Sequence, residues 1–210
     1  MPIKESSDEL NPAVAIGAGE IASKRKRSAL DYIALAVATC GVGYLPIAPG
    51  TLGALVGVAL YLPIHAWSYR LLETNAVRHR LSLIEVFTPH MALMLVVIFV
   101  VTMAGIWAAT RAEKMVQKKD PSIVVIDEVA GQMIALLSGP FWLPTWWSIL
   151  SAFILFRLFD IWKPYPIRRL EALESGLGIM ADDVVAGAYA LIVNSILISV
   201  YLLFVSPGPR

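Results

Sequence analysis

The stretch MALMLVVIFVVTMAGIWAAT, residues 91–110, decides the fold class of this chain, because its twenty residues include no charged side chain. A helix rises about 1.5 Å per residue, so a helix of this length matches the roughly 30 Å of hydrocarbon in a bilayer. The sequence therefore predicts a transmembrane helix over residues 91–110.

The composition of the whole chain agrees with this prediction. Of the 210 residues, 58% are hydrophobic and 16% are charged, and the mean hydropathy is +0.70. In soluble domains about 45–50% of residues are hydrophobic and about 25% are charged. A soluble chain of this size could not bury so much apolar surface. The net charge of +1 gives no overall attraction to nucleic acid, and the single cysteine, Cys40, excludes an internal disulfide. We therefore predict an all-α polytopic membrane protein.

Upstream of residues 91–110, the chain has no Lys, Arg, Asp or Glu from Tyr32 to Tyr69, but glycine and proline interrupt residues 41–50. Proline removes a backbone donor and glycine weakens a helix. We therefore predict a half-span at 30–40, an irregular loop at 41–50 and a full span at about 51–67.

Downstream, the uncharged stretch Val129–Phe156 is too long for one span and is interrupted by Gly139, Pro140 and Pro144. It predicts two spans, at about 122–138 and 145–161. A last span lies within 184–205, which makes about five spans plus the N-terminal half-span.

The basic residues predict the orientation of these spans. With the N-terminus inside, residues 1–50, 111–121 and 162–183 lie in the cytoplasm. Thirteen Lys and Arg residues then lie nearer the inner face and four nearer the outer face, as the positive-inside rule requires. The exception is the predicted outer loop at 68–90, which contains three arginines.

The N-terminal segment is polar and contains the basic run KRKR at 24–27. The first apolar stretch begins too late and runs too long for a cleaved secretory signal. We therefore predict a flexible cytoplasmic tail at 1–27 and a membrane-embedded domain at 28–210.

Five carboxylates gather near the inner face in this topology, and they come from three segments. They are Asp127, Glu128, Asp160, Asp182 and Asp183. Carboxylates at membrane depth are costly, so they indicate function unless another role explains them. Asp182 or Asp183 could instead cap the last helix, whereas Asp127 and Glu128 are predicted about one turn inside a span, where capping fits poorly.

Arg157, Asp160 and Lys163 are spaced three apart, which places them on one side of a helix. They could form only a membrane anchor with an internal ion pair. Alternatively, the carboxylates form a site for Mg²⁺, which prefers oxygen ligands, with one member of each adjacent pair binding the ion and the other supporting it or acting as base. Arg157 and Lys163 would then bind phosphate. Acids for a metal, bases for an anion and a membrane surface together indicate phosphate chemistry on a lipid headgroup.

Other phosphatase mechanisms lack their nucleophiles here. Cys40 is followed six residues later by Pro46 instead of arginine, the three histidines are predicted near the opposite face, and Asp-x-Asp and P-loop motifs are absent. A carboxylate–magnesium site with activated water remains. The alternative class is a membrane transporter or channel with an acidic cation site, but its ionisable residues should be distributed through the bilayer depth. A lipid phosphotransferase would carry a DG-x-x-AR motif, which is also absent.

Four blocks in this order resemble the bacterial phosphatidylglycerophosphatase A family, over about residues 28–205. The blocks are GVGYLPIAPGT at 41–51, IVVIDEVAG at 123–131, FRLFDIWKPYPIRRLE at 156–171 and GLGIMADDVVAG at 176–187. The departures are Val42, where the family commonly has serine, and Ser175, where a glycine often precedes the last block.

The resemblance implies a magnesium-dependent enzyme of the bacterial inner membrane that converts phosphatidylglycerophosphate to phosphatidylglycerol in phospholipid biosynthesis. It implies metal or base roles for the five carboxylates and phosphate binding by Arg157 and Lys163. Thr51 and the backbone around Gly50, at the predicted start of a helix, are further candidates for binding phosphate oxygens.

Overall fold

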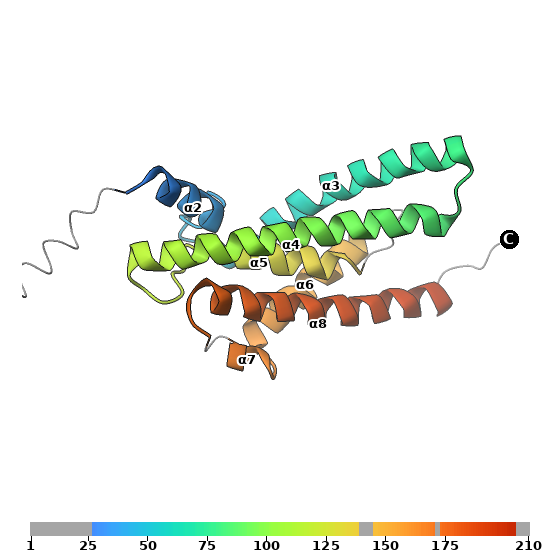
Figure 1. Cartoon of the computed structure of the whole chain (residues 1–210). Coiled ribbons are helices and arrows are strands. Elements are labelled where there is room, and N and C mark those ends of the chain that lie inside the picture. The colour runs from blue at the N-terminus through green and yellow to red at the C-terminus, as the bar shows by residue number, and fades with distance from the viewer. Residues whose placement is uncertain (1–26, 139–144, 171–172, 205–210) are drawn as a thin grey trace, which may run out of the picture.

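The computed structural model describes residues 27–138, 145–170 and 173–204, and every regular element in these ranges is a helix (Figure 1). The all-α prediction is confirmed there. The predicted tail lies outside these ranges except for residue 27, and so do Gly139, Pro140 and Pro144. The helices are α2 (Ala29–Thr39), α3 (Pro49–His79), α4 (Leu83–Val116), α5 (Ile126–Leu136), α6 (Trp146–Trp162), α7 (Ile167–Leu170) and α8 (Ser175–Phe204).

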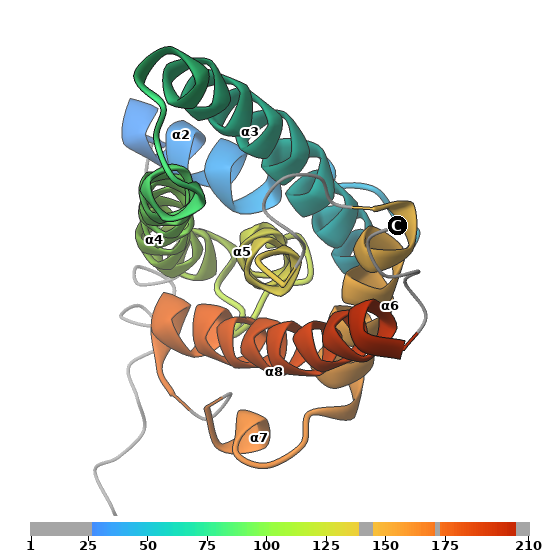
Figure 2. The ribbon, with the colours of Figure 1, turned by 90° about the vertical axis from the view of Figure 1, so that its right-hand side faces the viewer.

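Helix α5 lies in the centre of the molecule, with α3, α4, α6 and α8 around it (Figure 2). Most of its residues are buried, including apolar residues on all its sides. A helix that is apolar all round is one that other helices enclose. The first turns of α3, α5 and α8, together with α2 and α7, lie toward one end of the bundle, opposite the α3–α4 hairpin (Figure 1).

Three helices, α3, α4 and α8, are long and apolar enough to cross a membrane. They contain the predicted spans at 51–67 and 91–110 and most of the last span. The predicted half-span is the short apolar helix α2. The spans predicted at 122–138 and 145–161 correspond to α5 and α6, which have 11 and 17 residues. At 1.5 Å per residue these helices are about 16 and 25 Å long, shorter than the hydrocarbon core.

The predicted outer loop at 68–90 is wrong, because most of it is helical. Helix α3 continues to His79 and α4 begins at Leu83. Residues 68–79 contain no glycine or proline, so nothing in the sequence ends α3 where its apolar stretch ends. Ser82 then starts α4 with a capping box, in which its backbone N–H donates to Glu85 Oε2 at 2.7 Å.

Helix α8 begins at Ser175, about nine residues before the predicted span. Its close approach to α5 depends on two glycines. A Cβ atom on Gly187 would overlap the carbonyl oxygen of Gly131 in α5. Small residues at such a crossing let two helix backbones pack directly, which brings the acidic stretch of α8 beside α5.

A buried polar network fixes α8 against α5 and α6 farther from the first turn of α5. The Asn194 amide donates to Ser138 Oγ at 2.6 Å and to the Ser148 carbonyl at 3.1 Å, and it accepts from Ser151 Oγ at 2.6 Å. Asn194 is fully buried. Hydrogen bonds to a buried amide are expensive to lose, so this network stabilises one relative placement of the three helices.

Candidate active site

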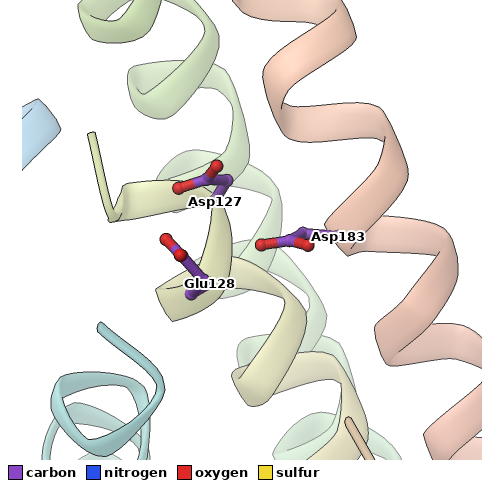
Figure 3. A group of neighbouring side chains, drawn as sticks. All are labelled: Asp127, Glu128 and Asp183. Atoms are coloured by element: carbon purple, nitrogen blue, oxygen red, sulfur yellow. The ribbon is translucent and has the colours of Figure 1, made fainter. Parts of the chain in front are cut away.

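Three carboxylates converge between α5 and α8 (Figure 3). Asp127 and Glu128 come from the first turn of α5, and Asp183 projects toward them from α8. Each offers an oxygen atom within 4.8 Å of the other two. We call these three residues the acidic cluster.

Local structure explains how α5 presents its acids. The Val125 backbone N–H, just before α5, donates to the Ala38 carbonyl at 2.8 Å. This hydrogen bond fixes the start of α5 against α2. Asp127 and Glu128 therefore lie at the N-terminus of a helix, and the prediction that they lie a turn inside a span is wrong. Their negative charges interact favourably with the helix dipole there.

The capping explanation for the two acids of α8 is also wrong. Asp182 and Asp183 lie about two turns inside the helix, which begins at Ser175. They are 7% and 3% exposed, so both are carboxylates buried among helices. A helix-cap role does not account for a buried acid at this position.

Two buried oxygens of the acidic cluster have no hydrogen-bond donor among the described residues. Asp127 Oδ1 and Glu128 Oε2 are buried and receive no hydrogen bond from any residue that the structure describes. Two negative charges within 4.8 Å of each other repel by at least about 3.5 kcal/mol at an effective dielectric constant of about 20. Buried oxygens that repel one another at this separation suit a divalent cation, and Mg²⁺ prefers carboxylate oxygens.

The other two predicted acids each form an ion pair with a basic residue. Asp160 Oδ2 lies 2.6 Å from Arg157 Nη1, and Asp182 Oδ2 accepts a hydrogen bond from Lys163 Nζ at 2.8 Å. The first pair lies within α6, so the ion pair considered from the spacing is present. The second pair joins the C-terminal cap of α6 to α8, residues 19 positions apart.

One cavity of about 180 Å³ brings these groups together, and we call it the acid cavity. It is lined by Pro49, Asp120, Ser122, Val124, Asp127, Glu128, Asp160, Lys163, Asp182 and Asp183. All five predicted carboxylates and one of the two predicted basic residues therefore surround the same space. The acidic cluster and the paired acids together form its charged wall.

The glycine–proline loop reaches this site through the start of α3. A Cβ atom on Gly50 would overlap Glu128 Oε1 and lie 3.2 Å from both terminal nitrogens of Arg157. Gly50 is therefore the position where the backbone packs directly on two site residues. Pro49 lines the acid cavity, but Thr51 is not among the described residues that line it.

Two further residues that line the acid cavity, Asp120 and Ser122, were not predicted from the sequence, and Val124 was quoted only as part of the Asp-Glu block. Asp120 and Ser122 belong to the segment DPS at 120–122, which leads directly into that block. Its polar residues immediately before a block of candidate ligands are the signal that could have identified this segment.

Buried carboxylates and a basic group around one cavity of an all-helical, apolar chain suit phosphate-ester chemistry at a membrane. The sequence profile described as phosphatidylglycerophosphatase A matches residues 35–198. The chain therefore belongs to the phosphatidylglycerophosphatase A family, and it is a phosphatase.

Individual relatives agree with this assignment. A phosphatidylglycerophosphatase A of Haemophilus influenzae is 35% identical over 170 residues, covering 80% of this chain and 90% of that protein. The Escherichia coli protein of the same name is 30% identical over 171 residues, with 80% and 84% coverage. A Bacteroides thetaiotaomicron protein, provisionally named a phosphatidylinositol-3-phosphatase, is 39% identical over 156 residues, with 74% and 87% coverage. No solved structure matches this chain significantly.

Proposed function

We propose that this protein is a magnesium-dependent phosphatase that hydrolyses phosphatidylglycerophosphate to phosphatidylglycerol and inorganic phosphate. The observation that carries the proposal is the acidic cluster in a cavity that also contains Lys163. The names of the relatives from H. influenzae and E. coli support this lipid as the substrate.

The donor set of the acidic cluster fits magnesium. All its ligand atoms are oxygens, and one oxygen of each residue lies within 4.8 Å of the other two. Two of the buried oxygens receive no hydrogen bond from the described residues. Asp127, Glu128 and Asp183 would therefore hold the ion. Bound magnesium would supply the positive charge that activates a water molecule and stabilises the phosphoryl oxygens.

The remaining site residues bind the substrate and transfer protons. Lys163 lines the acid cavity and provides positive charge for the terminal phosphate, while Asp182 fixes the position of its ammonium group. Arg157, held by Asp160, offers a planar guanidinium next to the start of α3. Asp160 and Asp182 are outside the acidic cluster but line the same cavity, so they are the candidates to accept a proton from the attacking water.

The reaction needs only water as co-substrate. Water attacks the terminal phosphorus, the ester bond between phosphorus and the glycerol oxygen breaks, and that oxygen leaves with a proton as the free hydroxyl of phosphatidylglycerol. Inorganic phosphate is the other product. The cavity positions the reacting groups, and its charges stabilise the phosphoryl oxygens during the displacement.

We also propose that the site faces the cytoplasm in the bacterial inner membrane and serves phospholipid biosynthesis. The charge distribution supports the orientation, because thirteen basic residues lie nearer the inner face in the arrangement described above. A transporter with an acidic cation path is less favoured, because the five candidate carboxylates gather around one cavity and the family is a phosphatase family.

A phosphate-release assay on purified protein in detergent micelles tests the proposal. Hydrolysis of phosphatidylglycerophosphate should stop in chelator and return with Mg²⁺. Asp127→Asn should lower turnover by roughly two orders of magnitude or more, the scale lost with a charge-stabilising group. Glu73→Gln, which changes an exposed carboxylate of α3, is the control and should leave turnover unchanged.

Two results would contradict parts of this proposal. Full activity in chelator with verified absence of metal would exclude magnesium dependence. Faster hydrolysis of phosphatidylinositol 3-phosphate than of phosphatidylglycerophosphate would instead favour the activity named for the B. thetaiotaomicron relative.

A further inference from the structure

A second, larger cavity of about 460 Å³ adjoins the acid cavity, and six of its lining residues have no role in the site described so far. The two cavities share three lining residues, Asp120, Asp127 and Asp182. Because these residues line both, they form the boundary between the two spaces. The two cavities are therefore neighbours in the structure.

The residues that line only the larger cavity differ in charge from the acid cavity. They are Lys119, Arg168, Leu173, Ser175, Gly178 and Ile179. The two charged members are both basic, and they come from different elements, the α4–α5 loop and α7. The larger cavity thus has carboxylates at its boundary with the acid cavity and positive charge elsewhere, and we call it the basic cavity.

The first turn of α8 also contributes to the basic cavity, through Ser175 and Gly178. The N-terminal end of a long helix carries partial positive charge and exposes backbone N–H groups, which favour an anion. Leu173 and Ile179 add an apolar part to the wall. This lining suits an anionic group that is attached to carbon chains.

We propose that the basic cavity binds the phosphodiester of a lipid headgroup while the acid cavity holds the phosphomonoester of the same headgroup. Lys119 and Arg168 are then specificity-determining residues that bind the diester. This inference rests on the proposed function, because phosphatidylglycerophosphate carries both groups separated by one glycerol unit. Phosphatidic acid carries the monoester alone, so it lacks the group that the basic cavity binds.

Neighbouring basic residues provide matched controls, because neither of them is among the described residues that line the basic cavity. Lys118 precedes Lys119 in the same loop. Arg169 follows Arg168 in α7, and its guanidinium carbon lies 4.9 Å from the centre of the Tyr165 ring. Replacing either control residue removes the same charge from nearly the same place in the chain.

The test compares Lys119→Ala and Arg168→Ala with Lys118→Ala and Arg169→Ala in one detergent at fixed Mg²⁺. Removing a charged hydrogen bond to the diester should lower kcat/KM for phosphatidylglycerophosphate roughly tenfold or more. The same variants should hydrolyse phosphatidic acid within about twofold of the wild-type rate, because this lipid lacks the diester that Lys119 and Arg168 bind. Loss of a charged contact would change the rate by far more than twofold. The control variants should match the wild type on both lipids.

An inhibition measurement makes the test independent of the rate on phosphatidic acid. Glycerophosphoglycerol, a soluble phosphodiester without a phosphomonoester, should inhibit the wild type competitively and lose potency against Lys119→Ala and Arg168→Ala. Inorganic phosphate should inhibit these variants as it inhibits the wild type, because it binds in the acid cavity.

Equal losses on both lipids, losses in the control variants of the same size, or unchanged inhibition by glycerophosphoglycerol would overturn the inference while leaving the proposed function intact. Absence of phosphatidylglycerophosphate hydrolysis by the wild type would overturn both. The two failures are therefore distinguishable.

Discussion

Asp183→Asn tests the acidic cluster through stability as well as activity. Asparagine keeps the size of the side chain but removes one of the three negative charges that lie within 4.8 Å of one another. When the three acids are ionised and no metal is bound, the substitution removes two repulsive pairs, each worth at least about 3.5 kcal/mol at an effective dielectric constant of about 20. The variant should therefore unfold at a higher temperature than the wild type in chelator.

Magnesium should reduce this difference in Tm between the variant and the wild type. A ligand at 100 times its dissociation constant stabilises the native state by about 2.7 kcal/mol, which corresponds to roughly 5–10 °C in a domain of this size. The wild type should show this increase in Tm, and the variant should lose most of it. Turnover should fall by roughly two orders of magnitude or more.

Thermal unfolding in one detergent, followed across a magnesium titration, measures both effects, and Glu73→Gln serves as the exposed control. If Asp183 were only structural, its replacement would lower Tm equally with and without magnesium. That result, or an unchanged magnesium response together with near-wild-type turnover, would refute the assignment of the acidic cluster as the metal site.

Two further predictions concern the start of α3 and the orientation of the chain. Gly50→Ala should leave Tm within a few degrees, because its Cβ meets only the flexible ends of Glu128 and Arg157, but it should lower phosphate release on the order of 100-fold by displacing these groups. With the native cysteine replaced, a cysteine at Glu174 should react with an impermeant thiol reagent only from the cytoplasmic side, and one at Arg80 only from outside. Near-wild-type phosphate release by Gly50→Ala would contradict the first prediction. Labelling of position 174 on intact cells would contradict the second.

The sequence predicted the helical class and most helix positions because both depend on local properties. Uncharged stretches of about twenty residues predict spans wherever they occur, and α4 and α3 contain the predicted ones. Helix ends were predicted less well. The predicted spans end where their apolar character ends, whereas α3 and α8 extend through polar residues that are compatible with a helix.

The candidate site was predicted in its members but not in its arrangement. The sequence identified the five carboxylates through their position near one face and through the family blocks. The capping alternative for Asp182 and Asp183 stayed open until the start of α8 was known. Asp120 and Lys119 were not identified, because charged residues in polar loops resemble any solvated surface in a sequence. Arg168 lies in the block at 156–171, but no role was predicted for it.

The sequence by itself determined that this chain is a helical membrane protein of the phosphatidylglycerophosphatase A family, because hydropathy and motif order are properties of neighbouring residues. Only the tertiary structure decided that α5 is a short central helix, that Asp183 joins Asp127 and Glu128 while Asp182 pairs with Lys163, and that a basic cavity adjoins the acidic one. These features depend on distances between segments far apart in the chain. Such distances are set by close packing, such as that of α8 on α5 at their paired glycines, and local sequence patterns do not specify them.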